Sequence, residues 1–196
     1  QYILKDYPDE RKYCFAYSKA VKDIALRRYA ETLKPEWDDL YWRAMLWEAP
    51  MLLDSYCLYI EKNRKPQERF YQPRRKTLKK VVDKLQALED DELDELFIHM
   101  PARVGKSQII TLGTSWHCGR DTEKSNLYVT YKEGLGGAFL DGVMEIWTDP
   151  TYCHNDVFHH KVARTDAKNH KVDLERKKKY ATLSGKGLES GLNGEY

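Results

Sequence analysis

The sequence of 196 residues has no long apolar segment, no excess of charge of one sign and no paired cysteine motif. No apolar run approaches the roughly 20 residues that a membrane-spanning helix needs. With 33% charged residues and a mean hydropathy of −0.75, the composition excludes a membrane protein. Lys and Arg number 33 against 31 Asp and Glu, so the net charge of +2 does not by itself indicate a nucleic-acid-binding protein.

The four cysteines are widely scattered, and none forms a C-x-x-C pair. A disulfide framework is not expected in such a chain, so reduced thiols are the predicted state. Cys118 follows His117 and Cys153 precedes His154, a pattern that can be interpreted as zinc ligands. Structural zinc sites usually show tighter ligand pairs, so four buried or half-buried thiols are the preferred interpretation.

Residues 8 to 62 show the apolar spacing of helices. Pro8 is expected to begin the first helix, and Lys34-Pro35-Glu36 to end it and open a second. Pro50 is expected to kink or restart that second helix. An aromatic stripe is predicted to pack between these helices, with base stacking as the alternative. It comprises Trp37, Tyr41, Trp47, Tyr56 and Tyr59.

The rest of the chain alternates predicted strands and helices. Residues 63 to 76 are polar and basic and are predicted to form a linker, followed by a third helix. Residues 96–100 and 127–131 are short apolar runs typical of buried strands. Helices are predicted over 108–118, ending at Gly119, and over 133–147. Strand, helix, strand, helix in this order predicts an α/β fold with a parallel sheet.

The loop after the first predicted strand reads Met100-Pro101-Ala102-Arg103-Val104-Gly105-Lys106-Ser107. It contains the Gly-Lys-Ser end of the phosphate-binding P-loop, G-x-x-x-x-G-K-[ST], but Met100 stands in place of the first glycine. Backbone N–H groups at the start of the next helix would face a phosphate there. Lys106 is expected to neutralise the β- and γ-phosphates and Ser107 to hold Mg²⁺. An ordinary solvated turn is the alternative.

Arg103 lies inside this loop, where a guanidinium adds a second fixed positive charge. Arginine binds phosphate through two parallel hydrogen bonds in one plane. An arginine at this position is able to stabilise the charge that develops on the γ-phosphate, as an arginine finger does.

A P-loop without its first glycine, and with an arginine two residues before the Gly-Lys-Ser, resembles that of the large terminase subunit of tailed bacteriophages. That protein is the ATPase that drives DNA into a preformed capsid and also cuts the genome. The segment Phe70-Tyr71-Gln72-Pro73 resembles the family's adenine-recognition motif. Residues 109–120 resemble the helix after its P-loop, and 127–152 its next strand and helix.

The resemblance implies a P-loop NTPase core of the additional-strand type over residues 67–196, preceded by an N-terminal helical segment over 1–66. It implies ATP and Mg²⁺ as cofactors, with Gln72 reading the adenine edge and Tyr71 stacking on it. Arg103 and Lys106 would be catalytic. The implied nucleotide-binding residues are Tyr71, Gln72, Ala102, Arg103, Val104, Gly105, Lys106, Ser107 and Gln108, with Ser107 on the metal.

The same resemblance implies double-stranded DNA, a small terminase subunit and a portal protein as partners, a homo-oligomeric ring, and the host cell cytoplasm as the location. A motor of this class needs a Walker B strand ending in two acidic residues, and no such run follows Ser107. We therefore expect the chain to be the front of a longer ATPase, interrupted before Walker B. It is expected to hydrolyse ATP poorly and to lack the parent's nuclease domain.

Residues 161 to 179 are strongly basic and are interpreted as either a DNA-facing loop or a solvated hairpin. Arg164 and Arg176 are both candidates for an arginine finger that reaches a neighbouring subunit. Two other functions stay open. One is a helicase-like or other P-loop ATPase, and the other is a non-catalytic helical scaffold with a degenerate P-loop.

Overall fold

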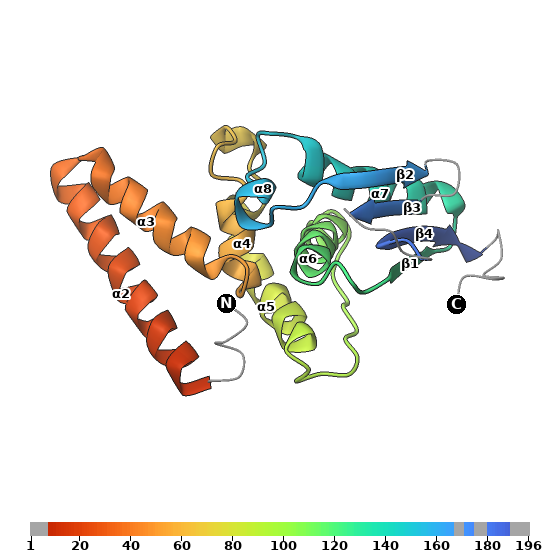
Figure 1. Cartoon of the computed structure of the whole chain (residues 1–196), viewed down its shortest axis with the longest axis horizontal. Coiled ribbons are helices and arrows are strands. Elements are labelled where there is room, and N and C mark those ends of the chain that lie inside the picture. The colour runs from red at the N-terminus through yellow and green to blue at the C-terminus, as the bar shows by residue number, and fades with distance from the viewer. Residues whose placement is uncertain (1–7, 167–170, 175–179, 189–196) are drawn as a thin grey trace.

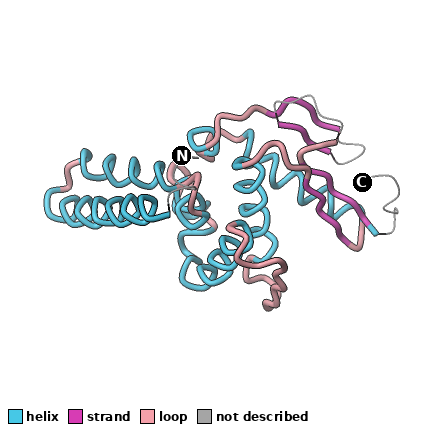
Figure 2. Tube along the Cα trace, turned by 60° about the horizontal axis from the view of Figure 1, so that its bottom comes forward, coloured by secondary structure: helices cyan, strands magenta, loops and turns pink. Residues whose placement is uncertain are grey.

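The computed structural model describes residues 8–166, 171–174 and 180–188, and it begins with two long helices that form a hairpin. These are α2 (Pro8–Thr32) and α3 (Pro35–Glu48). Leu33 turns the chain between them with a φ of 52°, and Pro35 begins α3 as expected. The hairpin projects to one side of the molecule, away from the strands (Figures 1 and 2).

In the described part of the chain, six further helical segments form the body beside the hairpin. They are α4 (Leu53–Tyr59), the 3₁₀ turn η1 (Pro66–Glu68), α5 (Tyr71–Glu89), α6 (Lys106–Arg120), α7 (Glu133–Thr148) and α8 (His154–Val157). The predicted linker is therefore partly helical, because α5 begins at Tyr71 and takes Pro73 in its first turn, where a missing N–H costs nothing. Among the residues described, no helix is long and apolar enough to span a bilayer.

The strands form one mixed sheet in the order β1-β4-β3-β2. They are β1 (Asn126–Thr130), β2 (Val162–Asp166), β3 (Lys171–Leu174) and β4 (Leu183–Gly187). β1 and β4 are parallel, whereas β2, β3 and β4 pair antiparallel. The α/β class is confirmed, but the sheet is mixed and not parallel throughout.

The strand predicted over residues 96–100 is absent from this sheet, so that prediction was wrong. These residues are extended and have no partner strand in the described part of the chain. Their side chains alternate between half-buried and exposed, and Phe97 is 79% exposed. An apolar run becomes a strand only where another backbone supplies its hydrogen bonds, and the run itself does not encode that partner.

One apolar core joins the helices on both sides of residue 66 to the sheet. It includes Met45 and Tyr56 from the N-terminal segment, Leu112 and Trp116 of α6, and Leu183 of β4. The indole N–H of Trp116 donates to the carbonyl of Ala49 over 2.9 Å. This bond and the apolar core hold helix α6, which begins at the candidate loop, against the N-terminal helices and the sheet.

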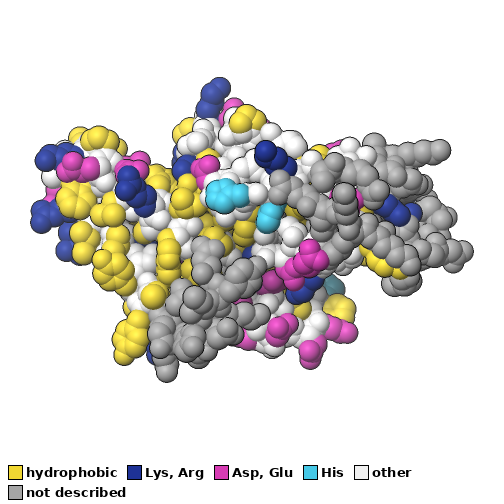
Figure 3. Space-filling view, in the orientation of Figure 1, with side chains coloured by type: hydrophobic (Ala, Val, Ile, Leu, Met, Phe, Trp, Pro, Cys, Tyr) yellow, Lys and Arg dark blue, Asp and Glu magenta, His cyan; other side chains and the backbone are white. Residues whose placement is uncertain are grey.

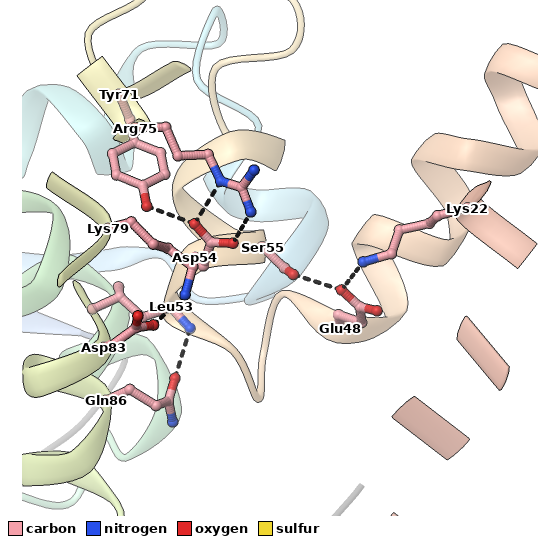
Figure 4. A network of polar contacts seen from close by, with 10 residues as sticks. All are labelled: Lys22, Glu48, Leu53, Asp54, Ser55, Tyr71, Arg75, Lys79, Asp83 and Gln86. Atoms are coloured by element: carbon pink, nitrogen blue, oxygen red, sulfur yellow. Dashed lines mark hydrogen bonds and ion pairs between the residues drawn. The ribbon is translucent and has the colours of Figure 1, made fainter. Parts of the chain in front are cut away.

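A polar network connects the hairpin to the body (Figure 4). The buried carboxylate of Glu48 in α3 accepts hydrogen bonds from Lys22 of α2 at 2.5 Å and from Ser55 of α4 at 2.6 Å. Because Glu48 is 2% exposed, these two donors supply the polar contacts that its charge requires. The hairpin is therefore held by a specific contact as well as by apolar packing.

Apolar side chains gather on the face of the hairpin that Figure 3 shows, beside charged side chains near its tip. A groove of about 590 Å³ runs between its helices, lined by residues that include Tyr17, Val21, Leu40, Ala44 and Trp47.

In the aromatic stripe of the sequence, Tyr56 and Tyr59 are buried, and the other three side chains are half-buried.

Candidate functional site

The loop from Pro101 to Gly105 leads directly into the first turn of α6. Gly105 is the N-cap of α6 and has a φ of 97°, in the left-handed region that side chains disfavour. The first helical hydrogen bond runs from the N–H of Ile109 to the carbonyl of Gly105 over 3.0 Å. The N–H groups of residues 106–108 have no acceptor within the helix. The positive end of the helix dipole therefore lies at this loop.

Arg103 also has a left-handed backbone, with a φ of 63°. A non-glycine residue in this region costs about 1 kcal/mol or more. Two left-handed residues within three positions give the loop a defined turn. The side chains of Ala102, Arg103, Lys106 and Ser107 are exposed, while Val104 and Gln108 are half-buried.

Phe70 packs directly against the loop, although it lies 35 positions earlier in the sequence. A Cβ atom at Gly105 would lie 2.5 Å from Cζ and 2.7 Å from Cε2 of the Phe70 ring. The ring thus occupies the space that any side chain at position 105 would need. Gly105 is required here both by its backbone conformation and by this contact.

Glu61 fixes the segment that carries Phe70. Its carboxylate is 1% exposed, and its two oxygens accept the N–H groups of Phe70 and Tyr71, each over 2.9 Å. Burial raises the pKa of Glu61, and these backbone hydrogen bonds act in the opposite direction. A buried acid thereby caps the start of α5 and sets where the Phe70 ring lies.

Tyr71 and Gln72, the residues expected to contact adenine, have partners of their own. Tyr71 is fully buried, and its hydroxyl donates to Asp54 over 2.5 Å (Figure 4). Its ring therefore lies in the core and does not offer a surface for stacking. Gln72 is exposed, and its side-chain oxygen accepts from Arg69 over 2.7 Å, which leaves its amide NH₂ available.

Three cations lie on or beside the loop without a carboxylate partner among the described residues: Arg74, Arg103 and Lys106. The guanidinium of Arg74 lies 5.1 Å from the centre of the Phe70 ring and donates to the carbonyl of Phe70 over 3.1 Å. Its Cδ would lie 3.9 Å from a Cβ at Gly105. The neighbouring Arg75, in contrast, is neutralised by Asp54 at 2.7 Å.

The described residues contain no group of three or more His, Cys, Asp or Glu side chains arranged to hold a metal. Ser107 offers an exposed hydroxyl in the first turn of α6. None of the four cysteines forms a disulfide, and all except the half-buried Cys14 are buried.

The basic segment is only partly described. Arg164 lies in β2, which pairs with β3 as an antiparallel hairpin. Residues 167–170 and 175–179, including Arg176, lie outside the described residues. Neither candidate for an arginine finger is therefore placed by a contact of its side chain.

Glu61 and Arg74 lie beside this loop and were not singled out in the sequence, and Phe70 was named there only as part of the Phe70–Pro73 segment, without a role of its own. Phe70 adjoins the Tyr71-Gln72 pair, so its aromatic character was a usable signal. Glu61 and Arg74 are ordinary charged residues in charged segments, and only the packing of α5 beside the loop distinguishes them.

Comparisons of the chain with models of protein families, with curated proteins and with solved structures found no match. A functional proposal for this chain therefore rests on its own residues.

Proposed function

We propose that residues 101–108 bind the phosphates of a nucleoside triphosphate. The observation that carries this proposal is the left-handed Gly105 at the N-cap of α6, followed by exposed Lys106 and Ser107. N–H groups without an acceptor inside the helix and the helix dipole favour an anion at this position. Lys106 and Arg103 add two positive charges that no described carboxylate neutralises.

Each loop residue has a distinct role in this proposal. Lys106 neutralises the β- and γ-phosphates, Ser107 contributes its hydroxyl to Mg²⁺, and Arg103 binds the γ-phosphate where charge develops during transfer. Gln72 is the candidate for reading the adenine edge through its free amide NH₂. Tyr71 is left out of the proposed site because it is buried.

The wider proposal is the ATP-binding portion of a DNA-packaging motor that resembles the large terminase subunit. It rests on the arginine inside the loop, on the glycine-less start of the P-loop, and on the segment that includes Gln72. This proposal includes a P-loop ATPase core and a homo-oligomeric ring in the cytoplasm. Its proposed partners are double-stranded DNA, a small terminase subunit and a portal protein. Phe70 packed on Gly105 supports it, since that contact brings the adenine-motif segment to the loop.

Lys106→Ala is expected to weaken binding of fluorescent Mg-ATP by about 30-fold, because a hydrogen bond to a charged group contributes roughly 1.5–3 kcal/mol. Titration of the wild type and of the variant measures this change. Lys19→Ala is the matched control, since Lys19 is an exposed lysine on α2 in the projecting hairpin. If the wild type does not bind Mg-ATP, or if Lys106→Ala binds it with equal affinity, the alternative of a non-catalytic helical scaffold with a degenerate P-loop is favoured.

A further inference from the structure

We propose that Arg74 of α5 is a further phosphate-binding residue of the loop, and that Phe70 is the residue that positions it. This inference rests on the proposed function, because it assigns a cation to the same nucleotide. It adds a side chain from a different element, 31 positions before Gly105.

The geometry brings Arg74 to the loop through the Phe70 ring. An edge of the ring touches Gly105, and the Arg74 guanidinium lies 5.1 Å from the ring centre. A cation over an aromatic face is attracted by the electrons of the ring. The bond from Arg74 Nη1 to the carbonyl of Phe70 adds a second restraint. The side chain is thus oriented beside the loop before any ligand arrives.

The charge of Arg74 is not used within the described structure. Arg75 forms two hydrogen bonds with the carboxylate of Asp54, at 2.9 and 2.7 Å. Arg69 donates to the carbonyls of Lys62 and Arg64 and to Gln72. Arg74 has one backbone carbonyl and one ring, and no ion pair with a described residue. Its remaining guanidinium donors are available for an anion, and phosphate matches their planar geometry.

Phe70 is a positioning residue in this arrangement and not a surface for the base. One edge of its ring is against Gly105, and a cation already lies over the ring. Its backbone N–H is held by the buried carboxylate of Glu61. Glu61, Phe70 and Arg74 therefore act in series, each one fixing the next, with the Arg74 guanidinium as the group that meets the ligand.

The test compares the affinities of Arg74→Ala for Mg-ATP, ADP and adenosine with those of the wild type. We expect about tenfold weaker binding of ATP and ADP, since the bond to a charged group is lost at an exposed site, and unchanged binding of adenosine. Arg74→Lys is expected to recover part of the loss, because it restores the charge without the planar fork. Lys76→Ala removes the same charge from an exposed position on the same helix and is expected to bind like wild type.

The outcomes separate this inference from the proposed function. If Lys106→Ala weakens ATP binding and Arg74→Ala does not, the loop binds nucleotide and the role of Arg74 is overturned. Equal losses for adenosine and ATP, or a lower thermal midpoint in Arg74→Ala that accounts for its loss, would assign the residue a structural role and overturn the inference. If the wild type binds no nucleotide, both proposals fall.

Discussion

Lowering the pH from about 7.5 to about 5 is expected to reduce the free energy of unfolding by about 2 kcal/mol through His154 alone. His154 is 1% exposed, and burial, helped by the nearby charge of His160, lowers its pKa from 6.5 to about 3. Between these two values the unfolded chain binds a proton that the folded chain does not. The contribution of His154 to the free energy of unfolding is therefore fully present above pH 6.5. It is lost as the pH falls toward 3, by about 5 kcal/mol in total.

The surroundings of His154 explain why the folded protein excludes this proton. Its Nδ1 lies 2.8 Å from the hydroxyl of Tyr56, which in turn lies 2.8 Å from Ser115 Oγ. The indole N–H of Trp147 donates to the same Ser115 oxygen over 2.9 Å. His154 Nε2 is buried and has no hydrogen-bond partner among the described residues. A second proton would place a charge among aromatic rings, with no described acceptor for Nε2, which is costly.

Urea denaturation of the wild type and of His154→Phe across this pH range measures the effect. The variant keeps a ring and the bond between Tyr56 and Ser115, but it has no group that titrates at this position. Its stability is expected to fall by about 2 kcal/mol less than that of the wild type at about pH 5. His159→Gln, at an exposed histidine, is the control. Its free energy of unfolding is expected to change with pH as that of the wild type does. Equal slopes in wild type and His154→Phe would contradict the account.

Gly185→Ala is expected to lower the free energy of unfolding by about 3 kcal/mol, since overpacking a tight contact costs roughly 1–3 kcal/mol and backbone cannot move aside. Gly185 of β4 lies against Gly136 of α7. A Cβ at position 185 would be 2.9 Å from the carbonyl oxygen of Gly136 and 2.7 Å from Cδ1 of Leu140. Helix α7 and the sheet would have to separate to admit the methyl group.

Gly134→Ala supplies the matched control, because Gly134 lies on α7, the helix that Gly185 contacts. A Cβ at this position meets nothing within 4 Å, so only helix propensity changes. Alanine is favoured over glycine in a helix by up to about 1 kcal/mol, and the variant is expected to be as stable as wild type or slightly more so. Urea denaturation of both variants and of the wild type measures their free energies of unfolding. Similar stabilities for the two would show that α7 does not pack on β4 as described.

The helices were largely predictable because their signals are local. Pro35 begins α3, and the residues around Pro50 separate α3 from α4, as the sequence indicated. Gly119 was misinterpreted as a helix stop, since α6 continues to Arg120. The ring of Phe158 packs on Gly119, 2.3 Å from where its Cβ would be. Glycine serves close packing as well as termination, and the sequence does not distinguish the two.

The errors in the sheet and the site arose where a partner is distant in sequence. Residues 96–100 have the composition of a strand but no strand beside them in the described chain. Tyr71 next to Gln72 suggested a stacking surface, yet Asp54, 17 positions earlier, holds its hydroxyl in the core. Phe70 packs on Gly105, 35 positions later, and its N–H is held by Glu61, nine positions earlier. None of these pairings follows from local periodicity.

The most direct test of the proposed function is the amide spectrum of ¹⁵N-labelled protein during titration with Mg-ATP. We predict that the largest shift changes occur at the N–H groups of Gly105, Lys106 and Ser107, with smaller changes at Phe70, because these groups lie at the proposed phosphate site. The amide chemical shifts of the α2–α3 hairpin are expected to stay unchanged. An unchanged loop at saturating nucleotide, or changes centred on the hairpin, would contradict nucleotide binding at this loop.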